Sequence, residues 1–311
     1  MAARFILSLD CEGKWGVADR LNGTHQRLFT TQGLRSAYSE LLKLLDGYSI
    51  PATFAFVGLF GEPANGSRSV LELLDGLAER APEYLGPACA EIKSGADGWN
   101  APWAVEAVGS SKTAHEIALH GLTHVPWTSI DDAFARMELS LARELTCATK
   151  AAKTFVFPRN AVAHVDLLGA AGLEGYRTAR RPMSRPMSLM SEFNVLAAPD
   201  GDLPLNVDGA VPIPAGRFVN ARAGLRNVVP TFVSRSRFRH MLDRAERSAS
   251  VVHLWMHPEN LLAAPRTLDL LKSMLGEVAS RRDSGRCRVL TQIEYVRERR
   301  HTASDGRTTT F

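Results

Sequence analysis

The chain has 311 residues, 45% of them hydrophobic, which is enough to bury one large core. Its net charge of +4 comes from scattered arginines without a basic stripe interleaved with aromatic residues, which argues against a nucleic-acid partner. The four cysteines are far apart, which argues against a disulfide framework, and no apolar run reaches the roughly 18 residues that span a bilayer. We therefore expect a globular, cytoplasmic protein without a membrane span.

Short apolar runs alternate with longer amphipathic segments, a pattern typical of a parallel sheet covered by helices. The runs predicted as strands are, in chain order, residues 4–10, 52–58, 116–120, 154–158, 175–179, 251–257 and 288–291. Apolar residues from Leu34 to Leu45 fall on one helical face, and those from Ile130 to Leu145 fall on a second. These features predict an α/β protein.

Three stretches lack this periodicity. Residues 87–112 are rich in Gly, Ala and Ser and are predicted to form a long excursion that serves as a lid or substrate loop. Residues 182–230 contain many Pro and Gly and are predicted as loops plus a hairpin. Residues 301–311 are polar and are predicted to form a disordered C-terminal tail.

Two carboxylates, Asp10 and Glu12, follow the first predicted strand directly and precede Gly13. Residues at i and i+2 of an extended strand point to the same side. One carboxylate of such a pair can bind a metal ion while the other takes a proton from water, and the pattern leaves their division of labour open. Two solvated acids at a strand end would give the same pattern, so it needs support from other residues.

Two histidines, His120 and His124, end and follow the third predicted strand at a spacing of four. Imidazoles at that spacing can face one ion if the segment makes a helical turn. Together with one carboxylate they match the three-ligand open site of a catalytic zinc or similar divalent ion. The sequence therefore predicts a metal site here.

Two arginines lie at the ends of predicted strands. Arg159 and Asn160 follow the fourth strand, where a guanidinium can fix the orientation of Asp10 and lower its pKa, or hold a substrate anion. Arg177 lies in the fifth strand and invites the same interpretations. An ordinary surface arginine is the alternative in each case. We assign Arg159 to the catalytic group, and Asn160 and Arg177 to substrate binding.

His253, Trp255 and His257 alternate with apolar residues in the sixth predicted strand, so they share one face. In a barrel the active site lies at the C-terminal edge of the strands, which favours His257 as the group that protonates a leaving group. For His253, a core side chain bonded to a backbone carbonyl competes with contact to substrate. Trp15 is predicted to bind substrate because an exposed indole can stack on a sugar ring.

These motifs resemble those of the NodB-type polysaccharide deacetylases, carbohydrate esterase family four, in order from Phe5 to Leu261. The resemblance implies a distorted (β/α)7 barrel of the polysaccharide deacetylase type, which we expect to form one domain over residues 1–300. The adjacent aspartates usual in that family are replaced by Asp10-Cys11-Glu12. Followed by Trp15-Gly16, this is similar to a divergent branch with a DxE first motif.

Carried over residue by residue, the resemblance implies a catalytic role for Asp10 as base, Arg159 as its orienting group and His257 as acid, and a metal-binding role for Glu12, His120 and His124. The aspartate that tunes the acid histidine in the family has no clear match at residues 175–181. Glu259 is the candidate substitute.

The activity implied is that of a metal-dependent hydrolase acting on a non-peptide C–N bond in carbohydrate metabolism. It would remove an N-acyl group, above all N-acetyl, from an amino sugar or sugar-containing compound, either a small molecule or an oligosaccharide. Zinc is the default ion for a carboxylate and two imidazoles, and nickel, cobalt or iron(II) satisfy similar ligands. The alternatives are a ring-opening or other linear amide hydrolase of the allantoinase or cyclic imidase type, and a non-catalytic carbohydrate-binding barrel. The sequence leaves open whether the chain forms a homo-oligomer.

Overall fold

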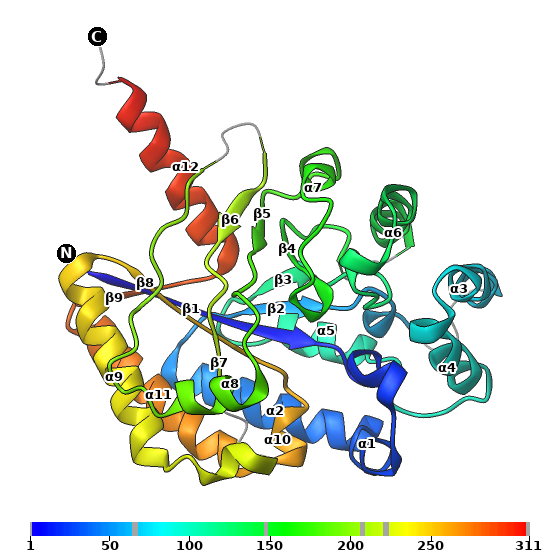
Figure 1. The fold of residues 1–311 in the computed structure, drawn as a ribbon, viewed down its shortest axis with the longest axis horizontal. Coiled ribbons are helices and arrows are strands. Elements are labelled where there is room, and N and C mark those ends of the chain that lie inside the picture. Colours follow the sequence, from blue (N-terminus) through cyan, green and yellow to red (C-terminus); the bar gives the residue numbers. More distant parts are fainter. Residues whose placement is uncertain (1, 64–67, 146–148, 206–208, 220–223, 309–311) are drawn as a thin grey trace.

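The computed structural model describes residues 2–63, 68–145, 149–205, 209–219 and 224–308. At its centre lies a sheet of parallel strands in the order β6-β5-β4-β3-β2-β1-β8-β7, with β9 paired beside β1. The strands are β1 (Ala3–Cys11), β2 (Thr53–Phe56), β3 (Glu116–Leu119), β4 (Thr154–Val156), β5 (Gly175–Arg177), β6 (Val211–Ile213), β7 (Arg217–Phe218), β8 (Val251–Met256) and β9 (Cys287–Leu290). Figure 1 shows the sheet curled with helices around it, which confirms the predicted distorted barrel.

All seven predicted strands are present, and two more, β6 and β7, lie within residues 182–230. The hairpin predicted for that stretch is wrong, because β6 pairs in parallel with β5 and β7 pairs in parallel with β8. These strands are only 3 and 2 residues long, and Pro212, Pro214 and Gly216 interrupt any alternation of apolar and polar residues. The sequence therefore carries little signal for either.

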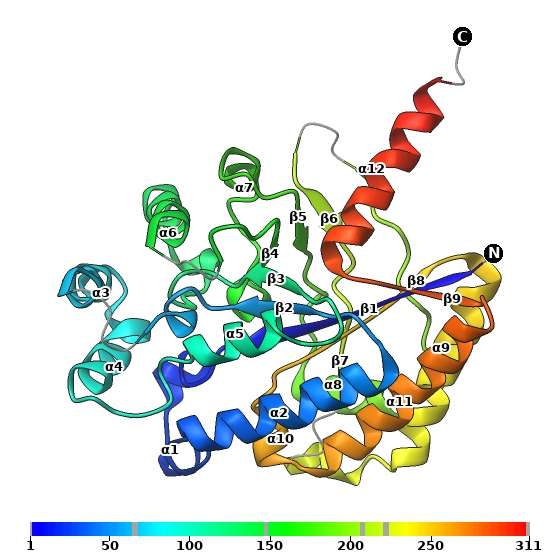
Figure 2. The same cartoon turned by 180° about the vertical axis from the view of Figure 1, so that it is seen from behind.

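The α-helices of the described residues are α1 (Gly23–Leu28), α2 (Thr31–Tyr48), α3 (Arg68–Arg80), α4 (Pro82–Lys93), α5 (Pro102–Gly109), α6 (Asp132–Leu145), α7 (Asp166–Ala170), α8 (Arg185–Glu192), α9 (Thr231–Ser248), α10 (Asn260–Ala263), α11 (Arg266–Asp283) and α12 (Gln292–Thr308). Short 3-10 turns are η1 (Trp15–Arg20), η2 (Leu59–Gly61), η3 (Trp127–Ser129), η4 (Pro158–Asn160) and η5 (Gly224–Val228). Helix α9 packs on β1, and α11 contacts both α2 and α9. Figures 1 and 2 show these three helices and α10 gathered on one side of the sheet.

Residues 87–112, predicted as a lid or substrate loop, are mostly helical, because α4 and α5 cover much of the stretch. Leu85 and Ala88 of α4 are buried, and so is Trp99 between the two helices. Burial of this face outweighs the low helix propensity of Pro87 inside α4. The stretch is therefore part of the core layer.

Helix α12 ends at Thr308, and residues 309–311 lie outside the described part of the chain, so the disordered tail expected for residues 301–311 stays a prediction. A helix that has already formed extends readily, since each added residue gains a backbone hydrogen bond. At its start, α12 places Tyr295 and Val296 in a buried cluster with Ile6 of β1 and Val211 of β6. The assignment of residues 1–300 to one domain stays a prediction.

Strand β1 is buried on both faces, and its side chains alternate between two environments. Phe5, Leu7 and Leu9 belong to the main apolar core, whereas Ile6 belongs to the separate cluster closed by α12. Because the side-chain period of a strand is two, Ser8 and Asp10 follow Ile6 on that second, inward face. The inward face thus becomes more polar toward the C-terminal end of the strand.

None of the helices in the described ranges combines the length and the apolar character needed to cross a membrane.

Candidate active site and metal centre

The end of β1 places Glu12 at the C-terminal edge of the sheet, where the chain turns at Gly13 with a φ of 54°. A carboxylate oxygen of Glu259, Oε1, accepts hydrogen bonds from the backbone N–H groups of Gly13 at 2.6 Å and of Glu12 at 3.3 Å. A Cβ at Gly16 would overlap the Glu12 carboxylate. The turn after β1 therefore fixes the position of Glu12 from both sides.

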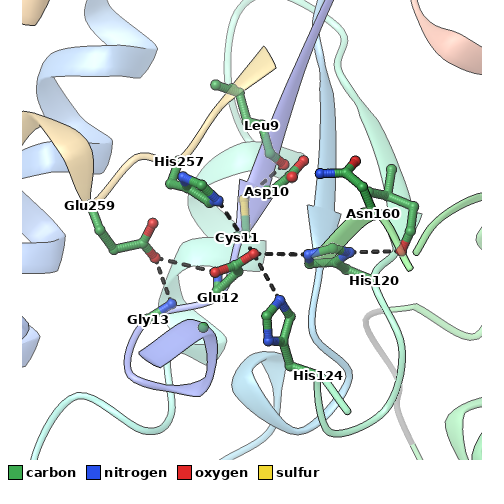
Figure 3. Close-up of polar contacts among 12 residues, drawn as sticks. Leu9, Asp10, Cys11, Glu12, Gly13, His120, His124, Asn160, His257 and Glu259 are labelled. Atoms are coloured by element: carbon green, nitrogen blue, oxygen red, sulfur yellow. Dashed lines mark hydrogen bonds and ion pairs between the residues drawn. The ribbon is translucent and has the colours of Figure 1, made fainter. Parts of the chain in front are cut away.

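Three imidazoles point toward one oxygen of that carboxylate (Figure 3). The distances to Glu12 Oε1 are 3.0 Å from His120 Nε2, 2.9 Å from His124 Nε2 and 3.4 Å from His257 Nε2. Ligand atoms of Glu12, His120 and His124 all lie within 4.8 Å of one another, and the same holds for Asp10, Glu12 and His257. The structure therefore brings together the five residues that the sequence singled out first.

The two histidines that follow β3 converge without the helical turn that their spacing suggested. His120 follows β3, and the loop turns through Gly121 and His124, whose φ angles are 72° and 67°. Glu138 of α6 holds this loop from behind: it accepts from the backbone N–H of Thr123 at 3.2 Å, from the Thr123 hydroxyl, and from the indole N–H of Trp127 at 3.2 Å. The ligand geometry is therefore set by tertiary contacts.

The donor set fits a divalent cation. His120 Nδ1 lies 2.7 Å from the Val156 carbonyl oxygen, and donation of its proton there leaves Nε2 of a neutral imidazole with a lone pair. Burial lowers the pKa of His124, which favours the neutral ring that a metal ligand requires, and the Glu12 carboxylate only partly opposes this. Burial raises the pKa of Glu12, but the neighbouring histidines outweigh this effect. The pKa of Glu12 is therefore held well below its usual range. Two lone pairs and an anionic oxygen thus face one another, an arrangement that a shared cation stabilises.

Asp10 is held by an arginine, but by Arg177 and not by Arg159 as predicted. Arg177 Nη1 and Nη2 lie 2.7 Å and 2.6 Å from the two carboxylate oxygens of Asp10, and both side chains are buried. Burial raises the pKa of Asp10, yet the charge and hydrogen bonds of Arg177 outweigh it and leave the pKa lowered. Arg177 also donates to Ser8 Oγ at 3.2 Å. It is therefore a positioning group for Asp10 and not the substrate contact that the sequence suggested.

Arg159 follows β4 in η4, where its φ is 55°. It forms a bidentate ion pair with Asp19 of η1, in which about a quarter of each side chain is exposed (25% and 24%). Asn160, its neighbour, does reach the site, and its Oδ1 accepts from Arg177 Nη2 at 3.0 Å. The prediction therefore failed for the orienting role of Arg159, whereas Asn160 lies at the site.

His257 follows β8 and is half-buried, with Nδ1 3.3 Å from Asn260 Oδ1. Burial alone would lower the pKa of His257, but the Glu12 carboxylate, followed by Asp10 and Glu259, raises it to about 9. Glu259 is itself buried, which raises its pKa to about 7. Its Oε1 accepts from the backbone of the turn after β1, and the side chain in hydrogen-bond contact with the His257 ring is Asn260.

Two residues predicted to bind substrate are buried elsewhere. Trp15 is 2% exposed, packs edge-on against Trp99 at 5.3 Å and donates its indole N–H to the Trp99 carbonyl. His253 is fully buried, with Nδ1 2.6 Å from the Pro214 carbonyl and Nε2 2.9 Å from Ser8 Oγ. Burial followed by the charge of Arg177 lowers the pKa of His253 to about 3, so this ring is neutral. Neither buried side chain offers a surface to a substrate: Trp15 packs on Trp99, and His253 contacts Ser8 inside the barrel.

A cavity of about 410 Å³ opens beside the site, and both His257 and Asn160 line it. Its walls also carry Trp255 and four arginines, Arg180, Arg217, Arg226 and Arg237. Sequence reasoning missed these arginines, along with Glu138 and Asn260. For the arginines, the sequence signal was their density between residues 177 and 239. Their convergence depends on the segment after β5, β7, η5 and α9 meeting in space.

The fold is a curled (β/α) barrel of the type found in polysaccharide deacetylases, with a carboxylate and imidazoles at the C-terminal edge of its strands. A presumed polysaccharide deacetylase from Mycobacterium smegmatis shares this fold with a TM-score of 0.63 at 15% identity, over 96% of this chain and 91% of that one. Puue allantoinase shares it with a TM-score of 0.54 at 13% identity, over 94% and 89% of the two chains. No protein-family model and no curated protein matches the sequence.

Proposed function

We propose that the protein is a metal-dependent hydrolase of a non-peptide C–N bond, which removes an N-acyl group, foremost N-acetyl, from an amino sugar or sugar-containing compound. The observation that carries this proposal is the convergence of the His120 and His124 Nε2 atoms on one oxygen of Glu12. Asp10 and His257 have ligand atoms within 4.8 Å of the same carboxylate. The proposed metal ligands and acid–base groups thus gather around one carboxylate.

Glu12, His120 and His124 would hold the cation, and zinc suits this donor set best, followed by nickel, cobalt or iron(II). When bound, the cation acidifies a water molecule and polarises the amide carbonyl. His120 is fixed for this role because its other ring nitrogen is bonded to the Val156 carbonyl, which sets the tautomer.

Asp10 would accept the proton of the attacking water. Its two oxygens are paired with the fork of Arg177, which keeps the carboxylate fixed in orientation and leaves its remaining lone pairs for a proton donor. Ser8 and Asn160 bind the same guanidinium and fix it in turn. The base is thus positioned by residues from β1, β5 and the loop after β4.

His257 would deliver a proton to the departing amine nitrogen. Its Nδ1 is near Asn260 Oδ1, and its Nε2 faces the site from the side opposite His120 (Figure 3). It also lines the cavity of about 410 Å³, where the amine-bearing part of the substrate would lie. The water proton taken by Asp10 and the proton given by His257 balance the hydrolysis of one amide into an acid and an amine.

Ring opening of a cyclic amide is the second candidate, favoured by the fold shared with Puue allantoinase. Both reactions add water across an amide C–N bond and need the same groups. They differ in the shape of the substrate and in whether the product stays in one piece, so the choice of substrate separates them.

The test is a paired assay of the metal-loaded protein: acetate release from N-acetylglucosamine and its oligosaccharides, and ring opening of allantoin. Asp10→Asn should abolish turnover with metal content unchanged, while Asp283→Asn, an exposed acid at the end of α11, should leave both unchanged. If Asp10→Asn removes the metal instead, Asp10 and Glu12 exchange roles. Sugar binding without any turnover by the loaded protein would overturn the proposal in favour of a carbohydrate-binding barrel.

A further inference from the structure

The cavity beside His257 carries more positive charge than its own carboxylates neutralise. Arg180 pairs with Asp200 at 2.6 Å, and Arg237 pairs with Glu192 at 2.7 Å. Arg217 also lines the cavity, and within the described ranges its side chain donates its one hydrogen bond to the Ala198 carbonyl at 3.1 Å. Three arginines of the cavity wall, Arg180, Arg217 and Arg237, thus share two acids.

Arg217 lies among other cations. Burial, followed by the charges of Arg180 and Arg237, lowers the pKa of Arg217 to about 10, which still leaves it charged near neutral pH. A guanidinium surrounded in this way gains from an anion that enters the cavity, because the neighbouring charges attract the same ligand.

Part of the hydrogen-bonding capacity of this wall is unused within the protein. Arg237 is 8% exposed, and its Nε is a buried donor without a partner among the described residues. The Nε of Arg217 and the hydroxyl of Ser234 share that condition. All three residues line a second, small cavity of about 30 Å³, and Arg217 and Arg237 border both cavities. An oxygen atom of a ligand or of a water molecule can satisfy buried donors of this kind.

An aromatic surface connects the arginines to His257. The rings of Phe218 and Trp255 lie 4.9 Å apart edge to face, and Trp255 lies 5.7 Å from His257. Arg226 stands over Phe218 at 5.3 Å and donates to Ser188 Oγ at 3.2 Å. Aromatic faces accept the apolar side of a sugar ring, so the cavity offers a ring-sized wall with cationic groups beside it.

We propose that this cavity is a specificity subsite that binds an anionic group, a carboxylate or a phosphate, carried by the N-acylated substrate. The proposal rests on the proposed hydrolase function, since it places the acyl group beside Glu12 and the negative charge among Arg180, Arg217 and Arg226. Guanidinium groups bind both kinds of oxyanion by paired, charge-assisted hydrogen bonds. The preferred substrate is therefore an acidic sugar derivative, and not a neutral chitin-like oligomer.

The test compares ligands that differ in charge. Calorimetric titrations of the metal-loaded protein use inorganic phosphate, N-acetylglucosamine, N-acetylglucosamine 6-phosphate and N-acetylmuramic acid. Parallel titrations in chelator exclude turnover and binding to the metal. We expect at least one acidic sugar to bind about tenfold or more tightly than the neutral sugar, as a charged hydrogen bond provides. The phosphorylated and carboxylated probes show which oxyanion is preferred.

Arg217→Gln and Arg226→Gln should each remove most of this preference, measured as the ratio of the affinities for the acidic and the neutral sugar. They lie on different elements, β7 and η5, so a folding defect in one leaves the other informative. Arg136→Gln is the matched control, because it removes one positive charge from an exposed position on α6.

Equal binding of neutral and acidic probes, no binding of any anion, or equal weakening by the control overturns the subsite. Turnover of neutral sugars without charge preference would leave the hydrolase proposal intact and this one refuted. Arginine-dependent binding of acidic probes without turnover would support the subsite and refute the hydrolase proposal.

Discussion

The buried ion pair of Asp10 and Arg177 yields the sharpest test of how this site is held. The Arg177 side chain is 0% exposed and that of Asp10 is 3% exposed, so Arg177→Met leaves a carboxylate without a partner away from water. Breaking a buried pair in this way typically costs about 3–5 kcal/mol of stability. Arg159 pairs with Asp19 where about a quarter of each side chain is exposed, so Arg159→Met should cost at most about 1 kcal/mol.

Urea unfolding followed by tryptophan fluorescence measures these losses, with chelator in every sample so that metal binding adds nothing. The decisive variant combines Arg177→Met with Asp10→Asn, which removes the stranded charge. We expect it to regain most of the lost stability while remaining inactive. Equal losses for the two arginine variants, or a double variant no more stable than Arg177→Met, would refute the assignment of Arg177 as the partner that holds Asp10.

Three further outcomes follow from the structure. Chelation should stop turnover without changing the circular dichroism spectrum, since the ligands lie at strand ends and not in the core. Added zinc should restore turnover, and a lasting loss of secondary structure would contradict the prediction. Gly16→Ala should lower metal affinity, measured by metal titration, because its Cβ displaces the Glu12 carboxylate, whereas Gly47→Ala, with open space around it on α2, should not. Burial raises the pKa of Glu116 above 4.5, so the stability it contributes is full below pH 4.5 and is lost as pH rises through the folded value. The urea midpoint of Glu116→Gln should lack that decline with pH. Identical pH profiles of the urea midpoint for the variant and the unmodified protein would refute this prediction.

The fold could be predicted where the physics is local. Buried parallel strands are short apolar runs, and all seven such runs are strands of the sheet. Strands β6 and β7 were not predicted because they are 3 and 2 residues long and are bordered by prolines and a glycine. Helix α4 was not predicted because Pro87 has a low helix propensity. Tertiary burial of Leu85 and Ala88 stabilises the helix in the folded protein.

The candidate site divides in the same way. Asp10 and Glu12 share a side because strands have a period of two, and His120 and His257 join them because parallel strands end at one edge. Which arginine reaches Asp10 has no such rule. β5 is separated from β1 by three strands in the sheet order, so Arg177 must reach across the curled interior. Only the curling of the whole sheet brings Arg177 and Asp10 together.

The height of a side chain along its strand explains why similar residues have different roles. On β8, His253 pairs in register with Ile6, deep in the barrel, whereas His257 lies past the end of the strand. The deeper imidazole contacts Ser8, Ser8 accepts from Arg177, and Arg177 holds Asp10, so one polar column runs upward to the proposed base. A histidine at the bottom of that column can only support it. At the top, beside Glu12 and the arginine-lined cavity, the same side chain can meet a substrate.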